Sequence, residues 1–311
     1  MIYIHGGAWI AGSGDSSTCG PKYLLDHDVI LVTMNYRLGA LGFLSTEDLV
    51  SPGNQGLKDQ ALAIRWVHEN IAAFMGDPNR ITIFGQSAGA VSVQLHMLSP
   101  LSRGFFHRAI SQSGTILNPT VQPRQGVAKN NAIKLGNLLN CPTNKSSALL
   151  ECLRKKNAVD IISTDYDFQD GYDFCKAYPF VPVIEPDHLG AFCKEESAQN
   201  LQSGNVSDVP WMTGVTSHEG SILTAVIYGS KDQQHVKIFD ENFMELGSKC
   251  MLLDQTCTEK FVHNVTKSIR KFYIGDKKID ESTRWNITDM YTDVYIHIGT
   301  NSAVRNHFAM L

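Results

Sequence analysis

The motif GQSAG at residues 85–89 constrains the fold more than any other part of the sequence. It joins a short β-branched run, residues 80–84, to a longer helical pattern, residues 88–98. A G-x-S-x-G motif between a strand and a helix is typical of a sharp turn that lifts the serine hydroxyl above the end of a sheet. Glycines fit where a side chain would clash with such a turn. We therefore expect Ser87 to be a nucleophile; a chance match in an ordinary turn is the alternative.

The rest of the chain alternates between strand and helix patterns, which predicts an α/β fold with a doubly wound, mostly parallel sheet. We expect one domain over residues 1–311. Within it, residues 1–118 would form the sheet core, and residues 119–311 a helical insertion with a further strand and loop. Strands are expected at residues 1–5, 29–35, 80–84, 106–111 and 209–214, and helices at residues 59–74, 88–98, 130–139, 146–154 and 291–311.

A second glycine motif, HGGAW at residues 5–9, follows the first expected strand. Consecutive glycines expose backbone N–H groups, so we expect Gly6 and Gly7, together with Ala88, to hold a substrate oxyanion. A phosphate-binding loop is the rival interpretation, but Ser17 occupies the place of its third glycine. His5 is expected to order the loop, and Trp9 either to line a pocket or to pack in the core.

Composition excludes several classes of protein. With 43% hydrophobic and 19% charged residues the chain should be globular, and its net charge of −4 does not favour nucleic acid as a partner. No apolar run reaches the roughly 18 residues of a membrane-spanning helix. The cysteines show no zinc-binding spacing, so no metal is expected.

Three further segments extend the motifs: NYRLGALGFL at 35–44, GNQGLKDQ at 53–60 and SQSG at 111–114. With the two glycine motifs, in this order, they resemble the type-B carboxylesterase family, which includes the cholinesterases; the insect esterases look most similar. The resemblance implies an α/β-hydrolase fold and hydrolysis of small carboxylic esters through an acyl-serine, without a cofactor. It leaves the natural ester and the oligomeric state open.

Hydrolases of this fold carry their triad in the order serine, acid, histidine. The resemblance assigns the acid to Glu219, in GVTSHEG at 214–220. The neighbouring His218 should point away from it. The family's histidine turn does not occur after Glu219, and the remaining candidates are His235, His263, His297 and His307. We therefore interpret the chain as an internal fragment truncated at both ends, with the catalytic histidine beyond residue 311, and expect it to be inactive alone.

The cysteines and sequons favour an oxidising compartment. The resemblance implies a disulfide between Cys141 and Cys152, with two free thiols as the alternative; the spacing of Cys250 and Cys257 is also suggestive. The first residues lack the pattern of a signal peptide, yet we expect a longer parent protein in the secretory pathway. The pairing of Cys19, Cys175, Cys193, Cys250 and Cys257 stays open, and N-x-[ST] sequons occur at Asn144, Asn205, Asn264 and Asn286.

A non-catalytic binding protein on the same fold is the alternative function. Such relatives typically lose the serine or disturb its turn. The turn is intact here, which favours the enzyme.

Overall fold

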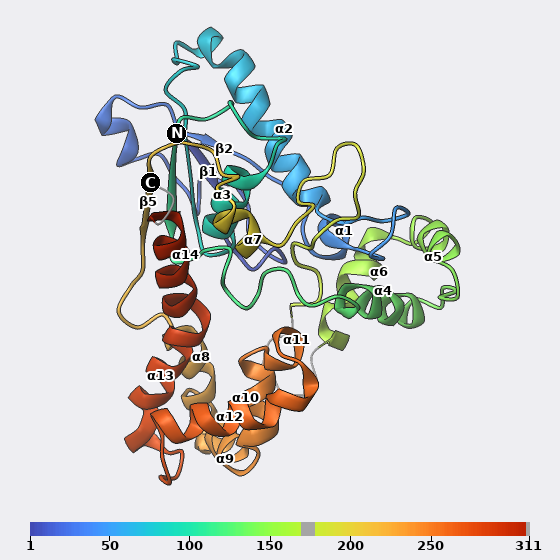
Figure 1. Cartoon of the computed structure of the whole chain (residues 1–311), viewed down its shortest axis with the longest axis vertical. Coiled ribbons are helices and arrows are strands. Elements are labelled where there is room, and N and C mark those ends of the chain that lie inside the picture. Colours follow the sequence, from blue (N-terminus) through green and yellow to red (C-terminus); the bar gives the residue numbers. More distant parts are fainter. Residues whose placement is uncertain (169–177, 309–311) are drawn as a thin grey trace.

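The computed structural model describes residues 1–168 and 178–308 and contains a parallel β-sheet flanked by helices (Figure 1). Every strand pairing in the described sheet is parallel, and the strand order is β2-β1-β3-β4-β5. The expected α/β architecture is therefore confirmed. The strands are β1 (Ile2–Ile4), β2 (Val32–Thr33), β3 (Thr82–Gln86), β4 (Arg108–Gln112) and β5 (Trp211–Gly214).

The direction of sheet growth reverses at β1. The chain first adds β2 on one side of β1, then crosses to the other side and adds β3, β4 and β5 in turn. Because crossover connections between parallel strands are right-handed, such a reversal places the connecting helices on opposite faces of the sheet. In sheets of this kind, ligands bind outside the carboxyl ends of the strands at such a reversal, which here are β1 and β3.

The helix that follows β3 has the bounds predicted from the sequence. Helix α3 (Ala88–Leu98) begins directly after Ser87 and ends before Ser99-Pro100, because proline disfavours a helical conformation in the residue before it. All of its residues are buried, and it contacts β1, β3 and β4. The helix is therefore part of the core, and its few polar side chains are buried with the apolar ones.

Two expected elements differ from the structure by more than a shift of their bounds. The strand predicted at residues 29–35 is only two residues long as β2. Its one described neighbour, β1, has three residues and therefore offers few backbone groups for pairing. The single helix expected at residues 291–311 begins earlier, with α13 (Arg284–Thr292). It then passes through a π-helical turn, η6 (Asp293–His297), into α14 (Ile298–Phe308). The last three residues of the expected helix, 309–311, lie outside the described part of the chain.

The buried apolar side chains form two clusters. One joins the sheet to α2 and α3, and it extends to helices of the insertion through residues such as Leu135 and Leu149. The other joins α8 through α13 and contains Phe239 and Tyr291; these helices form a lobe below the sheet in Figure 1. The boundary at residue 118 stays a prediction. The remaining α-helices of the described residues are α1 (Gly39–Phe43), α2 (Gln55–Asn70), α4 (Val127–Leu138), α5 (Ser146–Leu153), α6 (Ala158–Ser163), α7 (Ser197–Gln202), α8 (Ser221–Tyr228), α9 (Gln234–Glu241), α10 (Phe243–Cys250), α11 (Leu253–Thr256) and α12 (Glu259–Tyr273).

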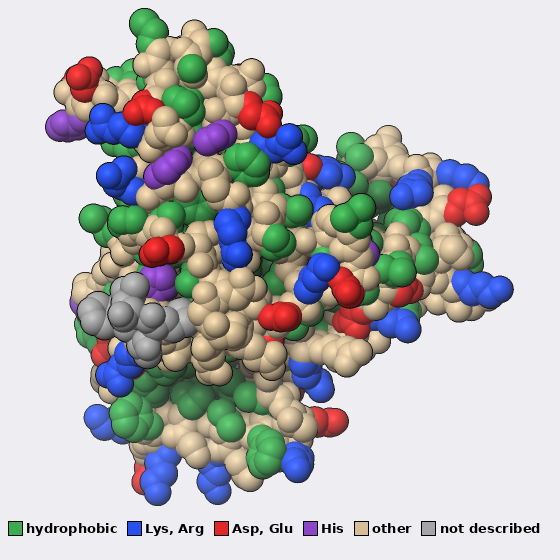
Figure 2. Space-filling model, turned by 45° about the horizontal axis from the view of Figure 1, so that its top comes forward, with side chains coloured by type: hydrophobic (Ala, Val, Ile, Leu, Met, Phe, Trp, Pro, Cys, Tyr) green, Lys and Arg blue, Asp and Glu red, His purple; other side chains and the backbone are tan. Residues whose placement is uncertain are grey.

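The surface mixes charges of both signs. Figure 2 shows basic and acidic side chains interspersed on the face in view, with hydrophobic side chains exposed between them. Among the described residues, no helix is both long and apolar enough to cross a membrane.

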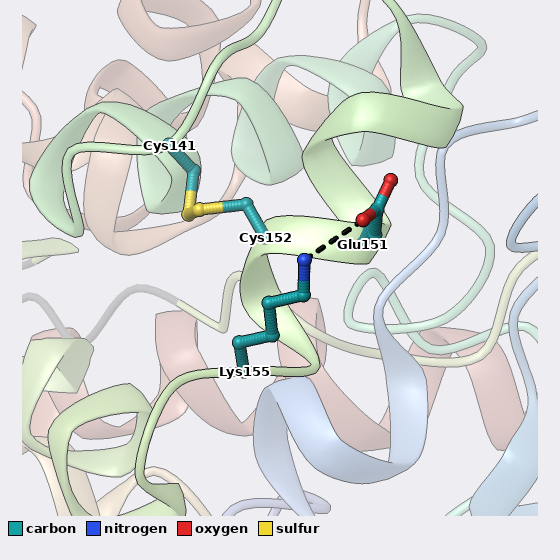
Figure 3. The surroundings of a disulfide bond; sticks show 4 residues. All are labelled: Cys141, Glu151, Cys152 and Lys155. Atoms are coloured by element: carbon teal, nitrogen blue, oxygen red, sulfur yellow. Dashed lines mark hydrogen bonds and ion pairs between the residues drawn. A yellow bond between two sulfur atoms is a disulfide. The ribbon is translucent and has the colours of Figure 1, made fainter.

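The disulfide between Cys141 and Cys152 is present, with the two Cα atoms 5.7 Å apart. It ties the start of the α4–α5 connection to the end of α5, where Lys155 also pairs with Glu151 (Figure 3). Cys250 and Cys257 are not bonded to each other, although their spacing in the sequence suggested a disulfide. Cys257 is free, whereas Cys250 is disulfide-bonded. Cys19 and Cys193 are also free, and Cys175 lies outside the described residues.

Replacing Cys141 and Cys152 together by alanine should lower the free energy of unfolding by about 3 kcal/mol, because the bond restricts a short loop in the unfolded chain. Urea denaturation of the full-length protein that contains this chain measures the change. Cys19→Ser is the control, since Cys19 is a free, half-buried thiol. Equal stability of the double variant and the wild type would contradict the prediction.

Candidate active site

Ser87 lies at the turn between β3 and α3, in a backbone conformation that is rare for a residue with a side chain. Its φ is 56° and its ψ is −123°. Such conformations cost about 1–3 kcal/mol and persist only where surrounding structure holds them. Here the Ser87 N–H donates to the Gln112 carbonyl at 2.9 Å, and the Ser87 carbonyl accepts from the Val91 N–H at 3.0 Å. Both backbone polar groups of Ser87 are thus held by the neighbouring strand and helix.

Two glycines let β1, β3 and α3 approach one another at this turn. A Cβ atom added to Gly89 would lie 2.0 Å from the Ile4 carbonyl oxygen, and one added to Gly85 would lie 2.5 Å from the Gly89 carbonyl. These contacts are with backbone atoms, which cannot move aside as a flexible side chain can. The predicted need for glycine at both ends of the motif is therefore explained by close backbone packing.

The loop after β1 lies beside Ser87. A Cβ atom added to Gly6 would be 3.2 Å from the Ser87 Cβ atom. Gly7, Ala8 and Trp9 follow with consecutive positive φ values of 109°, 54° and 59°. Within the described residues, the N–H groups of Gly7 and Ala8 donate to no backbone carbonyl. Sequence reasoning did not single out Ala8; its place directly after the glycines of HGGAW was the available signal.

Buried side chains anchor this loop. The Trp9 Nε1–H donates to the Ser92 hydroxyl at 3.2 Å, and that hydroxyl donates to the Ala88 carbonyl at 2.8 Å, so the loop is bonded to α3. Trp9 is only 1% exposed, which supports packing in the core over lining a pocket.

His5 has a structural environment. Its ring stacks on that of Tyr36, and the Tyr36 hydroxyl donates to the His5 carbonyl at 2.7 Å. Burial lowers the pKa of the His5 imidazole, because the charged form loses water. This buried, stacked ring fits the expected role of ordering the loop.

Glu219 lies on the loop that follows β5. Its Oε1 accepts a hydrogen bond from the Thr216 N–H at 2.7 Å. The next residue, Gly220, donates its N–H to the Thr292 hydroxyl at 2.9 Å, which ties the loop to α13. His218 points elsewhere: its ring lies against Trp285 and its Nδ1 is 2.9 Å from the Ser217 hydroxyl. The loop therefore presents Glu219 and His218 to different surroundings, as expected for adjacent side chains.

The other candidate histidines lie on helices of the lobe and the terminal segment. In the part of the chain that the structure describes, no histidine side chain hydrogen bonds with Ser87 or Glu219. His297 Nε2 is 3.1 Å from the Thr216 carbonyl oxygen, and His235 Nδ1 is 3.2 Å from the Val226 carbonyl oxygen. The ring of His307 packs against Trp211, and burial lowers its pKa. His263 is exposed on α12.

The four sequons differ in accessibility. Asn144, Asn205 and Asn264 are exposed. Asn286 is half-buried, and its Nδ2 donates to the Tyr273 carbonyl at 2.9 Å, so the atom that would carry a glycan is already engaged. Residues 1–168 and 178–308 contain no group of three or more His, Cys, Asp or Glu side chains suited to a metal ion.

Comparisons with known proteins agree on one family. The family model described as "Carboxylesterase family" matches residues 1–310. A carboxylic ester hydrolase of Bombus ignitus is 40% identical, with 94% of this chain covering 51% of that protein. A juvenile hormone esterase of Tribolium castaneum is 36% identical, with 98% of this chain covering 53% of that protein.

The fold matches a solved member as well. The crystal structure of juvenile hormone esterase from Manduca sexta, with OTFP covalently attached, superimposes with a TM-score of 0.82 at 27% identity. The match covers 95% of this chain and 54% of that one, so the chain spans about half the length of these relatives. With the α/β-hydrolase fold and this family match in agreement, the chain belongs to the carboxylesterase family.

Proposed function

We propose that the protein containing this chain is a serine carboxylesterase that hydrolyses small carboxylic esters. The observation that carries the proposal is the strained backbone of Ser87 beside the glycine loop, at the carboxyl ends of β1 and β3. Family membership supports ester hydrolysis as the reaction. The covalent attachment of OTFP in the Manduca relative is compatible with a nucleophilic residue in this family.

In the proposed reaction, the Ser87 Oγ attacks the ester carbonyl carbon while its proton passes to a histidine. The carbonyl oxygen becomes an oxyanion, held by the N–H groups of Gly6, Gly7 and Ala88, with Ala8 as a further donor. Ala88 is the first residue of α3, so the positive end of the helix dipole adds to this stabilisation. The alcohol leaves with the proton from the histidine, and an acyl-serine remains. Water, activated by the same histidine, then releases the acid and restores Ser87.

Glu219 is proposed to be the acid that orients the histidine. Its support is its place after β5, with the carboxylate held by the Thr216 N–H. The histidine itself is proposed to follow residue 311 in the longer protein. The order of triad residues in this fold supports this placement, as does the length of the relatives, of which this chain covers about half.

A secretory compartment is proposed for the full-length protein. The disulfide between Cys141 and Cys152 requires oxidising conditions. The exposed sequons at Asn144, Asn205 and Asn264 would be the sites open to glycans. A relative from Apis mellifera named venom carboxylesterase-6, 37% identical, is compatible with this placement.

Ser87→Ala in the full-length protein should abolish labelling by a fluorophosphonate probe and lower turnover of a nitrophenyl ester by at least about 10³-fold, because no other group forms the acyl-enzyme. Ser163→Ala, on the exposed face of α6, is the control and should label normally. Ester turnover within tenfold of the wild type would contradict the nucleophile assignment. A wild-type protein that neither labels nor turns over would favour the binding-protein alternative.

Glu219→Gln should reduce kcat strongly while KM changes little. The Thr216 N–H can still donate to the amide oxygen, so the loop should keep its shape, whereas the charge that supports the histidine is lost. The equivalent amide substitution in a serine protease triad costs about 10⁴ in kcat. The control is Glu259→Gln, an exposed carboxylate at the start of α12. A reduction of less than about threefold would return Glu219 to an ordinary loop residue.

A further inference from the structure

Residues 215–220 form the loop that carries the proposed acid, which we call the acid loop. Apart from bonds to the adjoining α8, its hydrogen bonds to other elements go, among the described residues, to one segment of the terminal helices. Its residues from Val215 to His218 are exposed, so packing contributes little to its conformation. Two hydrogen bonds connect it to residues 292–297. One runs from the Gly220 N–H to the Thr292 hydroxyl, and the other joins His297 Nε2 to the Thr216 carbonyl oxygen at 3.1 Å.

Thr216 links His297 to Glu219. Its N–H donates to Glu219 Oε1 at 2.7 Å, and its carbonyl oxygen faces His297 Nε2. A carbonyl oxygen only accepts hydrogen bonds, so Nε2 must carry the proton in this contact. Because one residue makes both bonds, a displacement of the Thr216 carbonyl would also displace the N–H that holds the carboxylate.

A second set of contacts fixes the orientation of the His297 ring. Nδ1 lies 3.5 Å from Asp293 Oδ1, and the other Asp293 oxygen accepts from the Tyr273 hydroxyl at 2.5 Å. Asp293 and His297 are the two ends of the π-helical turn η6. Single π-helical turns are rare and occur frequently at functional sites. The wider turn thus places a carboxylate beside one ring nitrogen while the other reaches the acid loop.

We propose that His297 is a positioning residue for Glu219, acting through Thr216 and oriented by Asp293. The inference rests on the proposed function, because it concerns the acid of that reaction. His297 donates to the loop from Nε2 and faces Asp293 with Nδ1, so each ring nitrogen is directed at a group other than Ser87. It therefore holds the acid in place, and it does not take the proton of Ser87.

Three variants of the full-length protein test the proposal. His297→Leu removes the donor to Thr216, whereas His297→Gln offers an amide N–H at the position of Nε2 but cannot act as a base. His263→Leu is the matched control, an exposed histidine on α12. One net hydrogen bond corresponds to at most about a tenfold effect on rate. We expect His297→Leu to lower kcat by about tenfold with KM within twofold, and His297→Gln and the control to stay within threefold of the wild type.

Combining His297→Leu with Glu219→Gln tests whether His297 acts through the carboxylate of Glu219 or in some other way. If His297 acts through Glu219, His297→Leu should change kcat by less than about twofold once the carboxylate is gone. A full tenfold effect in that background would overturn the proposal. So would a His297→Gln variant as slow as His297→Leu, which is the result expected if His297 were the base. Wild-type activity in His297→Leu would overturn it as well.

Amide hydrogen exchange provides a measurement that does not depend on turnover. Exchange across residues 215–219 should be faster in His297→Leu than in the wild type, and unchanged in His297→Gln. Unchanged exchange in His297→Leu would show that the loop does not need this contact and would overturn the proposal. A wild-type protein without ester turnover or labelling of Ser87 would instead overturn the proposed function, while the exchange result would still report whether His297 holds the loop.

Discussion

The close approach of backbone at Gly85 and Gly89 is the constraint on which the candidate site depends. With no side chain at either position, the carbonyl of Ile4 in β1 comes within reach of the first turn of α3. This contact brings the end of β1, and therefore the glycine loop that follows it, next to Ser87. The same packing borders the strained turn at Ser87, so one physical cause accounts for the placement of the proposed nucleophile and of the proposed oxyanion donors.

The topology of the sheet extends this arrangement to the acid loop. Because strand order reverses at β1, the loops after β1 and β3 leave neighbouring strands at the carboxyl edge of the sheet, and β4 and β5 follow on the same side as β3. All the strands are parallel, so the loop after β5 leaves the same edge of the sheet. Two hydrogen bonds, from the Gly220 N–H to the Thr292 hydroxyl and between His297 Nε2 and the Thr216 carbonyl, connect that loop to the terminal segment.

Sequence reasoning predicted the elements with strong local signals. The bounds of α3 follow from the serine motif before it and Ser99-Pro100 after it, and both are visible in the sequence. The short length of β2 was not predictable, because it depends on how many residues β1 offers for pairing. The π-helical turn of Asp293–His297 has no known periodic signature, and its two end residues contact Tyr273 and the acid loop, which are distant in the sequence. The Cys141–Cys152 bond was implied by family resemblance alone.

The most direct test of the central claim is the rate at which a fluorophosphonate probe labels Ser87 when Gly89 is replaced by alanine. The added methyl group would lie 2.0 Å from the Ile4 carbonyl, whereas the same replacement at Gly214 has no heavy atom within 4 Å. A misplacement of about 1 Å costs about a hundredfold in rate. The account predicts that Gly89→Ala, with its fold verified by circular dichroism, labels about a hundredfold more slowly, and that Gly214→Ala labels normally. A folded Gly89→Ala protein that labels within threefold of the wild type would contradict it.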